Sequence, residues 1–156
     1  VDTVAEVAGA PVPTGSDGLA MTVIEFTVPG APAPQGSKRH VGNGRMIESS
    51  KAVGAWRERV AIAAHNLMTA GCIAVRETEP LTVGIEFVMP RPKSTPKRVT
   101  PAAVKRPDLD KLVRAVFDAC TGVVWADDSM VVDVRASKRL AELGESPCAH
   151  VRVVWE

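Results

Sequence analysis

Two acidic groups lie close together in the second half of the sequence and have the residue types of a metal site. Asp108 and Asp110 flank a single leucine, and the adjacent pair Asp127 and Asp128 follows a short apolar stretch. Carboxylates are the hard oxygen ligands that Mg²⁺ prefers, and like charges held close together need a cation or protons to relieve their repulsion. The clustered aspartates therefore indicate a divalent metal site.

The segment directly upstream of these aspartates, residues 90–106, is basic and contains no acidic residue. Cationic side chains beside a Mg²⁺ site suit a nucleic-acid phosphate as substrate. We therefore predict phosphate contacts from this segment and from a second basic stretch nearer the start of the chain. The candidates are Arg91, Lys93, Lys97, Arg98, Lys105 and Arg106, together with Lys38, Arg39 and Arg45.

Each of these patterns also has an ordinary structural explanation. An aspartate after Pro107 is a common helix N-cap, and a second acid in the first turn is favoured by the helix dipole. Asp-Asp-Ser is a frequent turn composition, and a basic loop is often only a solvated surface. The residues by themselves leave the metal site and these structural roles open.

Composition excludes several classes of protein. The chain has 156 residues, 46% hydrophobic and 24% charged, which predicts one domain with a real core, and its net charge of +1 indicates no general affinity for polyions. Cys72, Cys120 and Cys148 are odd in number and far apart, which argues against a disulfide scaffold and predicts a reducing, cytoplasmic location. No apolar run is long enough for a membrane helix, so we expect no membrane partner.

The first twenty residues differ in composition from the rest of the chain. Residues 1–20 have no Lys or Arg and are rich in small residues, which predicts a disordered leader. Met21 directly precedes the first strand pattern, so we expect the working domain to span 21–156. Without the leader, nineteen basic and fifteen acidic residues remain, a net charge of +4.

Apolar periodicity predicts a mixed sheet with two helices packed on it. The expected order is β-α-β-α-β-β-β, a single α+β domain. A long basic loop is expected over 29–47, and Ser49 or Ser50 is expected to cap the first helix. The predicted strands are 22–28, 81–89, 123–125, 130–137 and 148–155, and the predicted helices are 51–70 and Leu109 to Cys120, the latter ended by Gly122.

The run RPDLDKLVRAVFDACTGVVWADDSMVVDVRASK, residues 106–138, resembles the core of the RusA-type Holliday junction resolvases. That family has a D-x-D-N-L-x-K helix start, an F-D-A-L helix end and a D-D-x-x-V-x strand. The resemblance extends to IEFVMP at 85–90 and, more loosely, to residues 29–60. It therefore accounts for most of residues 22–155.

The resemblance implies a homodimer that binds four-way DNA junctions and nicks two strands symmetrically with Mg²⁺, or with Mn²⁺ in its place. The products would carry 5′-phosphate and 3′-hydroxyl ends. The implied ligands are Asp108, Asp110 and Asp128, with Asp127 as the alternative member of its pair. They would hold one or two ions that activate water and stabilise the leaving oxygen.

Two residues depart from the family pattern. Lys111 replaces the usual Asn, and Arg114 replaces a Lys one turn after Asp110. Arg114 can neutralise charge on the scissile phosphate from the same helix face, but it cannot shuttle a proton. Its alternative role is a surface ion pair with Asp110 or Asp118. Other positions that recur in the family are occupied here by Asp118, Asp133 and Lys138.

Two further functions remain as alternatives. One is a Mg²⁺-dependent nuclease for other branched DNA, which a panel of substrates would distinguish. The other is a non-catalytic DNA-binding module whose aspartates only cap and turn. Asp110→Asn separates these classes, because it should abolish cleavage by a nuclease and change little in a binding module.

Overall fold

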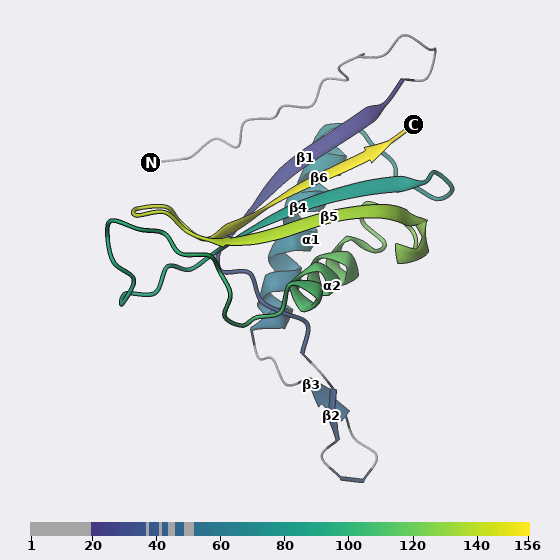
Figure 1. Ribbon diagram of the computed structural model, residues 1–156. Helices are drawn as coiled ribbons and strands as arrows, with labels where there is room; N and C mark the ends of the chain where they lie inside the picture. Colours follow the sequence, from purple (N-terminus) through teal and green to yellow (C-terminus); the bar gives the residue numbers. More distant parts are fainter. Residues whose placement is uncertain (1–19, 37, 41, 44–45, 49–51) are drawn as a thin grey trace.

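The computed structural model describes residues 20–36, 38–40, 42–43, 46–48 and 52–156 (Figure 1). A four-stranded sheet in the order β1-β6-β4-β5 forms one layer, and a separate two-stranded hairpin precedes the first helix. The strands are β1 (Thr22–Pro29), β2 (Lys38–His40), β3 (Met46–Glu48), β4 (Leu81–Met89), β5 (Val131–Leu140) and β6 (Cys148–Trp155); the helices are α1 (Val53–Ala70), α2 (Leu109–Cys120) and the short 3₁₀ helix η1 (Asp128–Met130).

The sheet is mixed, as the sequence predicts. β6 pairs antiparallel with both β1 and β4, whereas β4 pairs parallel with β5. Parallel neighbours need a crossover, and α2 supplies it between β4 and β5. The predicted single α+β domain, a mixed sheet with two helices packed on it, is thus confirmed.

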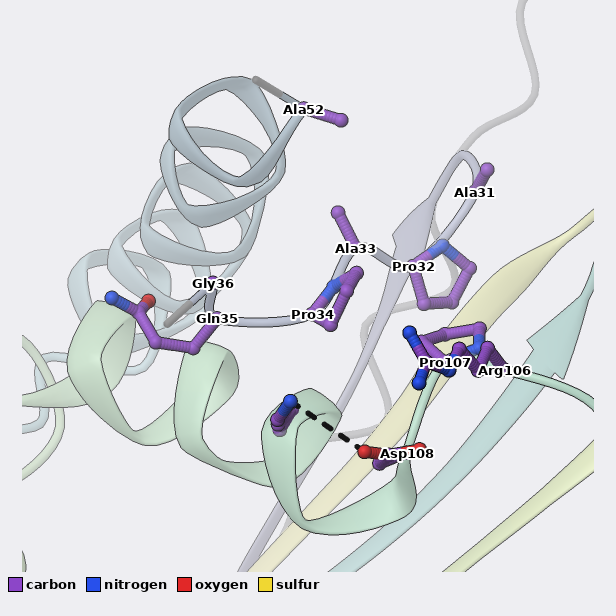
Figure 2. A pocket seen from close by; sticks show the side chains of 11 residues that line it. Ala31, Pro32, Ala33, Pro34, Gln35, Gly36, Ala52, Arg106, Pro107 and Asp108 are labelled. Atoms are coloured by element: carbon purple, nitrogen blue, oxygen red, sulfur yellow. Dashed lines mark ion pairs between the residues drawn. The ribbon is translucent and has the colours of Figure 1, made fainter. Parts of the chain in front are cut away.

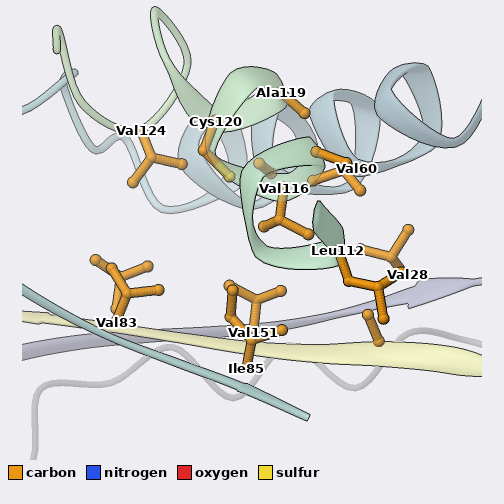
Figure 3. Packing of buried hydrophobic residues seen from close by; sticks show 14 of the residues in the cluster. Val28, Val60, Val83, Ile85, Leu112, Val116, Ala119, Cys120, Val124 and Val151 are labelled. Atoms are coloured by element: carbon orange, nitrogen blue, oxygen red, sulfur yellow. The ribbon is translucent and has the colours of Figure 1, made fainter. Parts of the chain in front are cut away.

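Both helices lie on one face of the sheet (Figure 1). Apolar residues alternate along β4 and β6, so Val83, Ile85 and Val151 point toward the helices while their neighbours face the other side. From α2, Leu112 and Val116 reach into the same layer and are fully buried (Figure 3). The core therefore lies between the strand residues that face the helices, which recur at every second position, and the helix residues that face the sheet, which recur at every third or fourth.

Several local predictions differ from the structure. Residues 123–125 do not form a strand of the sheet; Trp125 makes only isolated bridges to Arg76 and Thr121. The expected long loop over 29–47 contains the β2–β3 hairpin, where Gly42 and Asn43 have φ of 85° and 50°. These positive angles suit a tight turn, which reverses the chain and lets short strands pair.

The beginning of α1 also differs from the prediction. The helix begins at Val53 with Ala52 as its N-cap, which makes no side-chain capping bond. Ser49 and Ser50, the expected caps, lie outside the described residues, as do residues 1–19 of the leader predicted over 1–20. The end of α2 is as predicted, because Gly122 has φ of 81° and allows the chain to leave the helix.

No helix within the described parts of the chain is long and apolar enough to cross a membrane.

Candidate functional site

Asp108 and Asp110 lie at the amino-terminal end of α2, and both are exposed. Asp108 is the N-cap residue, with an extended backbone, but its side chain makes no capping hydrogen bond. Its carboxylate instead lies 3.5 Å from the ammonium of Lys111. An ordinary capping aspartate would accept a backbone N–H bond, so this carboxylate remains available to a ligand.

Lys138 of β5 holds the backbone that leads into α2. Its ammonium donates hydrogen bonds of 2.8 Å to the carbonyl oxygen of Lys105 and 2.7 Å to that of Pro107. The Arg106–Pro107 peptide bond between these two acceptors is cis. A lysine has three N–H donors, and two of them are used here. The lysine therefore fixes the chain one residue before Asp108.

An open groove of about 600 Å³ lies beside this helix end. Arg106, Pro107 and Asp108 form one wall, and the segment 31–36 forms the other (Figure 2). The backbone N–H of Gln35 donates a 2.9 Å hydrogen bond to the carbonyl of Lys111, which joins the two walls. The groove thus combines the exposed, ion-paired carboxylate of Asp108 with two cationic side chains, Arg106 and Lys111. These are the groups that a phosphodiester and a metal ion would contact.

Asp128 lies at the opposite end of α2. Its Oδ1 accepts a 2.5 Å hydrogen bond from Thr121 Oγ1 and a 2.9 Å bond from Trp125 Nε1. Trp125 is fully buried and meets Phe117 edge-to-face, with ring centroids 5.5 Å apart. The carboxylate of Asp128 is therefore held firmly at the carboxyl end of the helix.

The three predicted ligands do not meet within one chain. Asp110 and Thr121, the partner of Asp128, are eleven positions apart, which corresponds to about 16 Å along a helix axis. Oxygen ligands of Mg²⁺ lie roughly 2 Å from the ion. Over the part of the chain that the structure describes, no group of three His, Cys, Asp or Glu side chains could hold a metal ion. Asp108, Asp110 and Asp128 of a single copy therefore do not fit one ion.

Asp127 has a structural role in the fold. Its carboxylate accepts a 2.8 Å hydrogen bond from the backbone N–H of Ser129 and caps η1. Hydrogen bonds from the Ser129 side chain and backbone hold the pKa of Asp127 below its ordinary value. The turn role predicted for the Asp-Asp-Ser composition thus belongs to Asp127.

Arg114 is exposed on α2, and among the described residues it has no ion-pair partner. The alternative pair with Asp118 is not formed, because Asp118 lies 3.8 Å from Arg57 of α1. Arg57 also donates a 3.3 Å hydrogen bond to the side chain of Gln35. Asp118 therefore connects the two helices, and Arg114 keeps its charge toward solvent.

Arg91 organises the basic segment from within. Its guanidinium donates to Thr100 Oγ1 at 2.7 Å and to three backbone carbonyls, those of Pro96 at 2.7 Å, Val99 at 2.8 Å and Ala141 at 3.2 Å. Thr100 in turn donates a 2.6 Å bond to Glu142. This network fixes the loop against the β5–β6 connection.

The other basic residues of the segment face solvent. All five are exposed and have no ion pair with another described residue: Lys93, Lys97, Arg98, Lys105 and Arg106. Lys38 and Arg39 belong to β2, but their side chains and the whole of Arg45 lie outside the described residues. The exposed cations are thus held on a loop that Arg91 braces, next to the amino-terminal end of α2.

Two comparisons with known proteins cover the part of the chain that contains this site. The family model described as "Endodeoxyribonuclease RusA" matches residues 29–153, which include both ends of α2 and the basic segment. The chain is also 32% identical over 133 residues to "Uncharacterized protein YqaN" of Bacillus subtilis (strain 168), an alignment that covers 78% of this chain and 91% of that protein. The chain therefore belongs to the RusA endodeoxyribonuclease family.

Proposed function

We propose that this protein resolves four-way DNA junctions as a divalent-metal-dependent endodeoxyribonuclease. The observation that carries the proposal is the uncapped carboxylate of Asp108, next to Asp110, in a groove with Arg106 and Lys111. The family supports cleavage of DNA. The adjoining acid-free segment supplies exposed cations for the phosphates of several DNA arms.

The spacing of the aspartates supports a homodimer. One chain offers Asp108 and Asp110 at one end of α2 and Asp128 at the other end, beside Thr121. Two copies with their α2 helices antiparallel would bring Asp128 of each copy to the Asp108 end of the other. Such a dimer has two equivalent sites related by a two-fold axis, which suits paired, symmetric nicks.

Mg²⁺ is the proposed ion, and Mn²⁺ accepts the same oxygen donors. When bound, the ion would supply a nucleophilic water and neutralise charge on the departing 3′ oxygen. The chain's own residues have separate tasks: Arg106, Lys111 and Arg114 bind and orient the phosphate, and the exposed lysines of the basic segment hold the flanking backbone. The expected products are 5′-phosphate and 3′-hydroxyl ends.

The test compares a labelled four-way junction with a linear duplex of the same sequence, with and without Mg²⁺. Wild type should give paired nicks in the junction alone, and Asp110→Asn should bind the junction without cutting it. Asp118→Asn is the matched control, because it changes an exposed aspartate of the same helix whose partner is Arg57. Binding without cleavage by wild type under Mg²⁺ and Mn²⁺ would refute the proposal and indicate a DNA-binding module.

A panel with flaps and forks in the same assay addresses substrate choice. Equal cleavage of all branched substrates would refute selectivity for four-way junctions while retaining the nuclease. Selective cleavage of the junction would support the full proposal.

A further inference from the structure

Val104 is the most exposed large apolar side chain in the part of the chain that the structure describes, at 86%. Two others lie near the same end of the sheet, Val99 at 61% in the basic segment and Leu143 at 63% in the β5–β6 connection. A 2.6 Å hydrogen bond from Thr100 to Glu142 joins these two connections, which lie side by side at the left of Figure 1. Exposed apolar side chains that gather at one place indicate contact with a partner.

The backbone around Val104 is held in place. The N–H of Val104 donates a 2.9 Å hydrogen bond to the carbonyl of Ala102, which closes a tight turn. The carbonyl of the next residue, Lys105, accepts a 2.8 Å hydrogen bond from the ammonium of Lys138. An apolar group on a fixed backbone loses little conformational freedom when it binds. The Val104 side chain is therefore preorganised for contact.

The surroundings of Val104 are cationic. Lys105 and Arg106 follow it directly, both are exposed, and the whole segment 90–106 contains no acidic residue. A partner that meets this surface must therefore carry negative charge and also offer an apolar face. DNA offers both, with phosphates along its backbone and the flat faces of its bases.

The position of Val104 relative to Asp108 favours DNA as this partner. Val104 lies four residues before Asp108, so their Cα atoms are at most roughly 14 Å apart. Successive nucleotides of one strand are about 3.4 Å apart along a duplex, so this distance corresponds to about four nucleotides. Bases within about four nucleotides of a phosphate bound at Asp108 are therefore within reach of Val104.

Base faces distinguish a junction from a duplex, whereas phosphates do not. Both kinds of DNA carry the same phosphates, so cationic contacts position the protein without selecting the branch. In a linear duplex the base faces are covered by stacking. At a branch point the strands pass between arms, so the base pairs there lack a continuous stack and cost less to open. Apolar side chains inserted between bases keep DNA unstacked in several classes of DNA-binding protein.

We propose that Val104 contacts the faces of the bases at the branch point, holds them unstacked and thereby selects a junction over a linear duplex. The inference rests on the proposed function for the binding of DNA at Asp108, and it adds the residue that recognises the branch. Lys105 and Arg106 hold the adjoining phosphates. The turn at Ala102 and the bond from Lys138 fix the direction in which Val104 projects.

A fluorescent adenine analogue that brightens when it is unstacked tests the contact. The measurement is made without divalent metal, so that it does not depend on cleavage. With the analogue at the branch point of a four-way junction, wild type should raise the emission on binding and Val104→Ser should not. Val104→Leu keeps an apolar side chain and should behave as wild type. With the analogue half a helical turn into one arm, none of the three proteins should change the emission.

Binding affinities give a second readout. Val104→Ser should lower the ratio of junction affinity to duplex affinity about tenfold, because it loses the burial of an apolar side chain against the bases. Its duplex affinity should stay unchanged, because the cations remain. Ile62→Ser is the matched control, since it removes an exposed apolar side chain from α1 and should leave the ratio unchanged. Val104 is exposed, so urea unfolding of Val104→Ser should match that of wild type.

The outcomes separate this inference from the proposed function. A branch-point emission that rises equally with wild type and Val104→Ser, or with neither protein, would overturn the inference whether or not junctions are cut. An equal loss of junction and duplex affinity in Val104→Ser would also overturn it. A wild type that brightens the branch-point analogue but leaves junctions uncut with Mg²⁺ and Mn²⁺ would refute the nuclease and retain the contact.

Discussion

The ammonium of Lys138 lies 2.7 Å from the carbonyl oxygen of Pro107, the residue directly before Asp108. A strand at the sheet edge thereby determines the path of the chain into α2. The same ammonium holds the carbonyl of Lys105 at 2.8 Å, so the turn between these residues has two fixed points. The orientation of the Asp108 carboxylate follows from this attachment.

Replacement of Lys138 should impair cleavage more than binding. In Lys138→Met two carbonyls lose a charged donor, which should lower the free energy of unfolding by about 1 to 2 kcal/mol. The rate constant of junction cleavage should fall while the junction dissociation constant stays within about twofold, because the exposed cations that bind phosphate remain. Urea unfolding and single-turnover cleavage measure the two effects.

Lys138→Arg is the control for this prediction. It keeps the charge and the donors but changes their geometry, so it should regain most of the stability and only part of the rate. Equal losses of rate and junction affinity in Lys138→Met would indicate a direct DNA contact instead of a positioning role.

The periodicity of the sequence predicts the sheet and the helices of this fold but not the connections between them. Val83, Ile85 and Val151 alternate along β4 and β6, and the whole of α2 repeats at helical spacing, so these elements follow from local pattern. The apolar run around Trp125 predicts a strand there. Trp125 is buried by Phe117 and by its bond to Asp128, contacts that local periodicity does not contain.

The site shows the same division. Asp108 and Asp110 were found because two acids at the start of a helix are visible in the sequence. The separation of Asp128 from them follows from its bond to Thr121, which depends on how the chain turns after α2. The attachment through Lys138 joins residues 31 positions apart. The sequence contains one indication of this attachment. Lys138 falls at a position of β5 where the alternation of the strand predicts a buried apolar side chain.

Arg91 should control the rigidity of the basic segment. Arg91→Gln removes most of its hydrogen bonds to Thr100 and to the backbone, so the loop should open more often. Trypsin should then cut after Lys93, Lys97 or Arg98 roughly tenfold faster, since about 1.4 kcal/mol of lost local stability corresponds to that factor. The variant removes no cleavage site, because Pro92 follows Arg91 and blocks trypsin there.

Thr100→Val gives a graded comparison. It removes the hydroxyl that joins Arg91 to Glu142 but keeps the guanidinium bonds to the backbone. Cutting should therefore be intermediate between wild type and Arg91→Gln. Identical cutting rates for all three proteins would contradict the bracing role of Arg91.

The exposed cations of the segment should make DNA binding depend steeply on salt. Arg98→Gln should reduce the slope of log K against log salt by about 1, the value for one lost phosphate contact. Arg152→Gln is the control, since it removes the same charge from the uncovered sheet face, where Arg152 lies 3.0 Å from Glu25. Junction binding titrations at several salt concentrations measure both. Equal changes of slope in the two variants would show a general charge effect.

Cys120 should make the protein less stable at alkaline pH. Burial, and to a lesser degree the charge of Asp128, raises the pKa of this thiol from 9.0 to about 12. The folded pKa is raised, so the stabilisation is complete below pH 9 and is lost as pH rises toward 12. Between pH 9 and 12 the free energy of unfolding should therefore fall more steeply with pH in wild type than in Cys120→Ala. The difference in slope should be up to about 1.4 kcal/mol per pH unit. Parallel pH curves for the two proteins would contradict this.

Mixed dimers should recover activity if Asp128 acts across copies. Asp110→Asn and Asp128→Asn should each be inactive as pure proteins, because every site in either dimer lacks one carboxylate. In a mixed dimer, one site combines both substitutions and the other combines the intact Asp110 of one copy with the intact Asp128 of the other. Mixing the variants and allowing subunits to exchange should therefore restore single nicks in the junction, with paired nicks absent. Activity that stays lost on mixing, while exchange is shown by a size or affinity tag, would mean that each site draws both aspartates from one chain.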